Sequence, residues 1–203
     1  MQKLVLMMTA MVLAGCMVIE TPIVVPPIDG GFLSHDPCGP PCFFGITPGV
    51  TTEAEAREIM EQHPEISNGC EDFDFSKEGG MRGIRCYNKY GLRIGFTDDV
   101  VGGIGFRPTK ITLQQVLNAY GIPTSLRVGI VSLPDYPLRV RMILCFDQIS
   151  ADLILSDQDG KEFVVTGDTA TASIGYYPAG ESCVLPEDVT WNGYGAYPPA
   201  KWP

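Results

Sequence analysis

The sequence of 203 residues predicts an α+β fold of two tandem modules, each with one helix and a three- to four-stranded antiparallel sheet. Two observations lead to this prediction. The same helix-start pattern occurs twice, sixty residues apart, and several short runs typical of strands follow each copy. Short turn-like links between the runs indicate antiparallel pairing, with the helices covering one face of each sheet.

Both predicted helices begin at a capping box. Thr52 is followed three residues later by Glu55, and Thr112 is followed three residues later by Gln115. In each pair the threonine oxygen accepts from a free helix amide, and the longer side chain reaches back to the cap. Four positions of each helix, at i, i+3, i+4 and i+7, are expected to face a core: Ala56, Ile59, Met60 and His63, then Leu113, Val116, Leu117 and Tyr120.

Seven runs are expected to form strands. They are residues 83–87, 92–97 and 100–107 after the first helix, and 125–133, 138–146, 151–156 and 163–165 after the second. In 138–146 apolar residues alternate with Arg139 and Arg141, which is typical of a half-buried strand. The glycines of 101–105 are interpreted as a bulge or a site of close packing, and "DQDG" at 157–160 as a hairpin turn rather than part of a calcium loop.

The first residues are typical of a targeting segment. Lys3 precedes an apolar run of eleven residues, Leu4 to Ala14, which has the length of a signal-peptide core and is short for a membrane span. Small residues then precede Cys16, and a stretch rich in proline follows it. The alternatives are a secretory signal with a chance cysteine, or an uncleaved anchor.

Leu13-Ala14-Gly15-Cys16 closely resembles the lipobox of bacterial lipoproteins. The resemblance implies that the Cys16 thiol receives a diacylglyceryl group and that cleavage makes Cys16 the first residue of the mature chain. It also implies a location at the cell membrane, lipid-anchored and facing the extracytoplasmic side. The expected organisation is a signal peptide (1–15), a lipidated proline-rich tether (16–42), two helix-plus-sheet modules (43–108 and 109–186), and an aromatic, proline-rich tail (187–203).

Two further motifs carry a resemblance in architecture. "GITPGVTTEAEAREIM" (45–60) and "ITLQQVLNAYGIP" (from 111) resemble the helix starts of the β-lactamase-inhibitor-protein family and of the envelope-assembly lipoproteins of the BamE/SmpA type. The resemblance covers about residues 43 to 155 and implies tandem helix-plus-antiparallel-sheet modules. The "CGPPC" motif before the first module and the aromatic tail are not part of the pattern of either family. Because these motifs mainly determine the fold, the resemblance indicates little about function.

Six cysteines besides Cys16 predict up to three disulfides in an oxidising compartment: Cys38, Cys42, Cys70, Cys86, Cys145 and Cys183. The sequence allows fifteen pairings. Cys70 with Cys86, and Cys145 with Cys183, are favoured, while Cys38 and Cys42 pair with each other or each with a partner in the domain. A redox or metal role for "CGPPC" is disfavoured because redox pairs have two intervening residues and open a helix.

Composition excludes several classes of function. The net charge of −10 argues against partners made of nucleic acid or anionic lipid. The sequence contains only two histidines, His35 and His63, and no Gly-x-Ser-x-Gly element, so neither a zinc site nor an acyl-transfer triad is predicted. No catalytic residue, metal or cofactor is therefore expected.

The remaining candidates point to binding. Four aromatic residues of the tail either dock on a partner or fold back on the domain: Trp191, Tyr194, Tyr197 and Trp202. The favoured interpretation is a membrane-anchored, extracytoplasmic, non-catalytic module that binds another protein of the cell envelope. One alternative is an envelope hydrolase that uses Glu71, Asp72 and Asp74, although this cluster is interpreted as a solvated loop that enters a strand. The other is a thiol-redox protein that uses Cys38 and Cys42.

Overall fold

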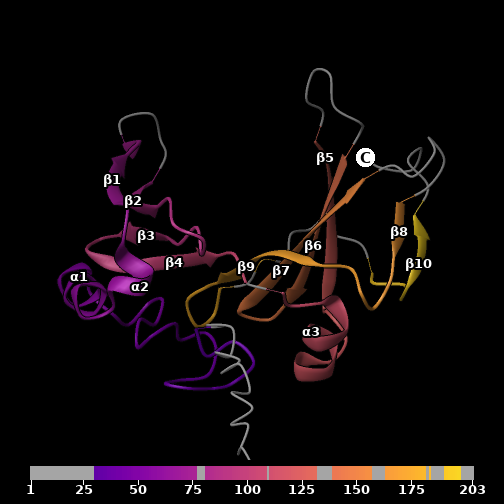
Figure 1. Ribbon diagram of the computed structural model, residues 1–203, viewed down its shortest axis with the longest axis horizontal. Coiled ribbons are helices and arrows are strands. Elements are labelled where there is room, and N and C mark those ends of the chain that lie inside the picture. Colours follow the sequence, from indigo (N-terminus) through magenta and orange to yellow (C-terminus); the bar gives the residue numbers. More distant parts are fainter. Residues whose placement is uncertain are drawn as a thin grey trace, which may run out of the picture.

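The computed structural model describes residues 30–76, 81–108, 110–131, 139–156, 163–181, 183 and 190–197. These residues form one eight-stranded antiparallel sheet, a two-stranded ribbon and three short helices (Figure 1). The helices are α1 (Glu53–Gln62), α2 (Pro64–Ser67) and α3 (Leu113–Tyr120). The strands before α3 are β1 (Cys70–Asp74), β2 (Arg82–Cys86), β3 (Arg93–Thr97) and β4 (Val100–Phe106). Those after it are β5 (Ser125–Val131), β6 (Arg139–Phe146), β7 (Ile149–Ser156), β8 (Phe163–Val165), β9 (Thr171–Tyr176) and β10 (Gly195–Tyr197).

The strand order in the large sheet is β1-β2-β3-β4-β9-β7-β6-β5. Each half of the chain runs back and forth between neighbouring strands, and the halves meet where β4 pairs with β9. β8 leaves the large sheet and pairs with β10 in the ribbon. The helices lie on one side of the sheet, below it in Figure 1. The opposite side is covered at its β5–β6 end by Cys183, which is bonded to Cys145 of β6, and carries no helix of the described chain.

The predicted fold class, α+β with two modules that each have a small sheet, is wrong. The chain is mostly β, and all strands of the two halves except β8 and β10 belong to one sheet. Two small sheets would leave β4 and β9 as edges with unpaired backbone groups. Their antiparallel pairing, which sets Ile104 opposite Tyr176 and Phe106 opposite Ile174, satisfies those groups instead.

Aromatic side chains bury the seam between β4 and β9. Phe32, from the segment before the first strand, is fully buried, and its ring lies 6.5 Å from that of Phe106 and 6.4 Å from that of Tyr176. The ring of Phe43 lies 4.5 Å from that of Phe106. One continuous apolar core therefore spans both halves and favours a single sheet.

The two predicted capping boxes are confirmed. Glu55 N–H donates to Thr52 Oγ1 at 3.3 Å and Thr52 N–H donates to Glu55 Oε2 at 2.8 Å, so α1 begins where the sequence indicates. The same reciprocal pair between Thr112 and Gln115 begins α3. Each helix then turns its apolar stripe toward the sheet.

Residues 30 to 46 lie against the sheet. Phe32, Phe43 and Ile46 are buried, and the Tyr120 hydroxyl donates to the carbonyl of Phe32. The part of the predicted tether around Phe32 is therefore packed on the core, whereas residues 34–37 are exposed. The predicted signal peptide, Cys16 and the first part of the tether lie outside the described residues.

Candidate functional site

The sheet face opposite the helices, called here the open face, carries most of the arginines. Alternation along β3 turns Ile94 and Phe96 into the core and leaves Arg93 and Thr97 on the open face. The same reasoning along the other strands places six of the eight arginines of the sequence there: Arg85, Arg93, Arg107, Arg127, Arg139 and Arg141. A chain with 24 acidic and 14 basic residues thus concentrates positive charge on one surface.

Glycines in register hollow the middle of the open face. Gly83, Gly95 and Gly103 lie directly opposite one another across β2, β3 and β4, and Gly105 lies opposite Gly175 of β9. Without side chains at these points, the face forms a groove of about 570 Å³, called here the glycine groove. Further residues that line it are Phe73, Phe75, Met81, Arg85, Arg93, Arg107 and Tyr177.

Two of these glycines keep space that no described residue fills. A β-carbon at Gly103 would come no closer than 3.6 Å to the carbonyl oxygen of Tyr176, and one at Gly105 no closer than 3.9 Å to that of Ile174. At Gly83, Gly95 and Gly175, by contrast, atoms of the chain lie within 3.0 Å of such a carbon. Glycine weakens a strand interior, by about 0.5–1 kcal/mol relative to alanine, and often marks close approach of a ligand or backbone.

Three arginines border the groove without a carboxylate partner among the described residues. Arg85 and Arg93 are directly opposite each other on β2 and β3, and Arg107 follows β4 on the same face. Like charges in directly opposite positions destabilise a sheet. The Arg85 guanidinium lies 5.1 Å from the centre of the Phe73 ring, and its Nε is buried without a hydrogen-bond partner in the described part of the chain.

The opposite border of the groove is satisfied internally. Asp152 is only 6% exposed, and its Oδ2 accepts from Ser173 Oγ at 2.7 Å and from Arg141 Nε at 3.2 Å. The hydroxyls of Ser150 and Tyr177 lie 3.3 Å apart. Available positive charge is therefore concentrated at the β2–β4 end of the groove.

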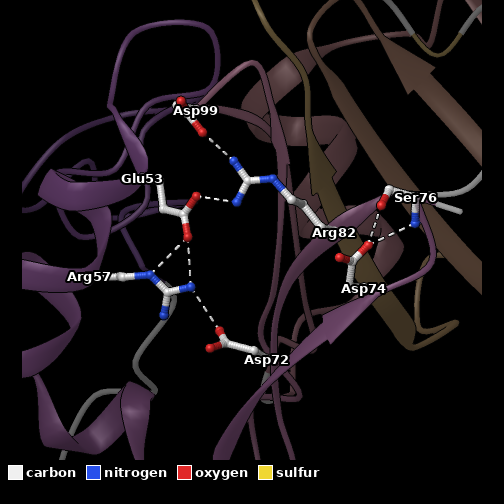
Figure 2. A network of polar contacts seen from close by, with 7 residues as sticks. All are labelled: Glu53, Arg57, Asp72, Asp74, Ser76, Arg82 and Asp99. Carbon is white, nitrogen blue, oxygen red and sulfur yellow. Dashed lines mark hydrogen bonds and ion pairs between the residues drawn. The ribbon is translucent and has the colours of Figure 1, made fainter.

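The two remaining arginines, on the helix side, are fully engaged by carboxylates (Figure 2). Arg57 Nη2 lies 2.7 Å from Glu53 Oε1 and 2.8 Å from Asp72 Oδ1, and Arg82 bridges Glu53 and Asp99. Burial of the Glu53 carboxyl raises its pKa, but the hydrogen bonds from Arg57 and Arg82 outweigh this effect, so the pKa falls below its ordinary value. This network ties α1 to β1, β2 and the β3–β4 turn, and it is structural.

The acidic cluster proposed for a hydrolase does not converge. The segment interpreted as a solvated loop that enters a strand is strand β1 from Cys70 onward. Alternation along β1 places Asp72 and Asp74 on the helix side and Glu71 on the open face. Asp72 is bound to Arg57, and Glu71 Oε1 accepts from the hydroxyl of Tyr87 at 2.7 Å. Asp74 accepts from Ser76 N–H at 2.8 Å (Figure 2).

The predicted cysteine sites are joined in three disulfides: Cys38–Cys42, Cys70–Cys86 and Cys145–Cys183. Cys70 and Cys86 are directly opposite on β1 and β2, which explains their pairing. The "CGPPC" motif forms a local loop, and Gly45 N–H donates to Cys38 Sγ at 3.3 Å.

The described part of the aromatic tail folds back on the domain. Trp191 and Tyr197 pack against the core with their ring centres 6.3 Å apart. Tyr194 donates to Gln114 Oε1 of α3 at 2.9 Å. Burial raises the pKa of the Tyr197 hydroxyl. Trp202 lies outside the described residues.

The glycine groove was not predicted from the sequence. The glycines of 101–105 were interpreted as a bulge or a site of close packing, and the register shift between Gly95 and Phe96 does place a bulge or irregularity at this point of the β3–β4 pairing. The usable signal was the spacing of Gly103 and Gly105, two residues apart in a strand, which puts both on one face.

The described residues include no group of three or more histidine, cysteine or acidic side chains arranged to hold a metal ion. None of the helices seen in the described part of the chain has the length and apolar character needed to cross a membrane. Comparisons with models of known families, with curated proteins and with solved structures found no match for this chain.

Proposed function

We propose that this chain is a lipid-anchored extracytoplasmic lipoprotein that acts as a non-catalytic protein-interaction module of the cell envelope, and that it binds its partner through the open face. The lipobox-like Leu13-Ala14-Gly15-Cys16 supports the anchor. Buried disulfide cysteines are in keeping with an oxidising compartment.

The glycine groove is the observation that supports the binding role. It combines unfilled space over Gly103 and Gly105 with exposed apolar side chains on its border, Phe75 at 46% and Met81 at 61%. Exposed apolar side chains grouped around a hollow are typical of interaction sites. The serine hydroxyl and the carboxylate that meet on this surface, Ser173 and Asp152, are also tied to Arg141 in an ion pair, and this internal engagement favours binding over catalysis.

Site-specific photo-crosslinking in the intact envelope tests the binding role. The full chain would carry p-benzoylphenylalanine in place of Phe75 at the border of the groove or, as a control, in place of Glu58, which is exposed on α1. We expect a discrete adduct with an envelope protein from position 75 and none from position 58. No adduct from position 75, or equal adducts from both, would contradict the assignment of the open face.

The intact mass of the protein extracted from its native membrane tests the anchor separately. We expect a chain that begins at Cys16 and carries acyl groups. A chain that retains residues 1–15 would refute the lipoprotein assignment.

A further inference from the structure

We infer that the glycine groove recognises a short acidic segment of the partner protein, which lies over Gly103 and Gly105 with its carboxylates on Arg85, Arg93 and Arg107. The inference rests on the proposed function and names the chemistry of its partner. It is carried by charge, by hydrogen bonding and by the shape of the groove.

Arg85 and Arg93 come from directly opposite positions of β2 and β3, where like charges repel. Glu71 is opposite Arg85 on β1, but its carboxylate accepts from the Tyr87 hydroxyl and forms no ion pair with Arg85 in the described part of the chain. Elsewhere three arginines of the protein each contact an aspartate or glutamate: Arg57, Arg82 and Arg141. An external carboxylate between Arg85 and Arg93 would turn this repulsion into attraction.

Hydrogen bonding points to the same place. Arg85 Nε is buried without an acceptor among the described residues, and a buried donor left unsatisfied costs about 1–3 kcal/mol. The ring of Phe73 holds the guanidinium from one side, at 5.1 Å from its centre. Guanidinium groups bind carboxylates through two parallel hydrogen bonds. The Nη groups of Arg85, on the border of the groove, are the donors that an external carboxylate reaches, because the chain itself covers Nε.

The shape of the groove selects a polypeptide segment. Gly103 and Gly105 allow a main chain to approach the floor of the sheet more closely than any side chain would permit. Phe73, Phe75 and Met81 supply apolar contacts next to the arginines. A segment with apolar residues beside aspartate or glutamate matches both surfaces.

The net charge limits the occupant to a short acidic segment. At −10 the whole molecule repels extended polyanions, such as acidic polysaccharides or nucleic acids, over a screening length of about 8 Å in physiological salt. A short segment can place a few carboxylates next to Arg85, Arg93 and Arg107. The rest of the segment then does not have to lie along the acidic surface around these arginines.

The test extends the crosslinking experiment with the full chain in its native envelope. The probe at Phe75 is combined with Arg93→Gln and Arg107→Gln. The charge-matched control combines it with Lys89→Gln and Lys110→Gln, two positions that do not line the groove. The arginine variants should lose about tenfold or more of the adduct, whereas the lysine variants should keep it. The partner peptide mapped by mass spectrometry should contain aspartate or glutamate near the crosslink.

Loss of the adduct should not result from unfolding of the variants. Arg93→Gln removes a contact between like charges, so the midpoints of urea unfolding should be unchanged or higher. An adduct that survives loss of both arginines, or that maps to a segment without acidic residues, would overturn this inference and leave the binding role intact. An adduct on polysaccharide would overturn the choice of a protein segment. No adduct in the parent chain would instead refute the proposed function.

Discussion

Truncation of Phe32 to alanine tests whether residues 30 to 46 belong to the folded core. The Phe32 side chain is fully buried, and its ring contacts those of Phe106, Tyr120 and Tyr176, with a shortest separation between ring centres of 5.0 Å. Loss of a buried phenylalanine costs about 3–5 kcal/mol, because the transfer free energy of the ring is lost and a cavity remains. The ring lies over the seam that joins the two halves, where surrounding strands cannot easily collapse, so we expect the upper part of this range.

Urea denaturation followed by tryptophan fluorescence measures the effect. With a denaturant dependence of about 2 kcal/mol per molar, the unfolding midpoint should fall by about 2–2.5 M. Phe75→Ala is the matched control, since it removes the same ring from a position that is 46% exposed and should cost about 1 kcal/mol or less. Equal losses in the two variants would show that the segment before α1 does not contribute to the core, and would refute this reasoning.

Three further predictions concern the disulfides, the helix caps and the ionic network. Replacement of Cys70 and Cys86 by serine removes a crosslink over a sequence separation of 16 and should cost about 3 kcal/mol in thermal or urea unfolding; no loss would contradict the role assigned to it. Thr112→Ala should cost about 1 kcal/mol through the lost cap of α3, whereas Thr112→Ser should keep most of the stability. Glu53→Gln should cost about 1 kcal/mol near pH 7, a modest value because its arginine partners are partly exposed. The pKa of Glu53 is lowered in the folded state, so the stabilisation is complete above its ordinary value of 4.5 and is lost as pH falls through the folded pKa; a difference between parent and variant that grows on acidification would contradict this sign.

Local signals in the sequence predicted the local structure. Both capping boxes were recognisable because each depends on two residues three positions apart, and both helices begin where predicted. The favoured pairs Cys70–Cys86 and Cys145–Cys183 both occur. These features are encoded within short stretches and do not depend on how the halves of the chain meet.

The single sheet could not be predicted in the same way. β9 contributes only Ile174 and Tyr176 to the core, with glycine and serine between and beside them, so its pattern resembles a loop. Of its two partners, β4 is distant in the sequence, and β7 is separated from β9 by β8. The register of β9 with both strands is set only when the whole chain has folded. Charge similarly hid β1, in which Asp72 is held by Arg57 of α1.

The candidate site depends on register even more strongly. Arg85, Arg93 and Arg107 are spread over more than twenty residues, and they meet only because β2, β3 and β4 pair in one particular alignment. A shift by one residue would turn each of them to the other face. The glycines are subject to the same constraint, since Gly83, Gly95 and Gly103 form a row only in that alignment.

The central position of β9 also bears on the order in which the chain folds. A polypeptide made from its N-terminus onward has β1 to β4 complete long before Thr171–Tyr176 exists, so β4 presents a bare edge during that interval. The outer strands of both halves have partners close in sequence, whereas closure at β4 and β9 joins segments about seventy residues apart and should be the slow step. Premature association between unfinished chains through that edge is the hazard that a holding chaperone would need to prevent.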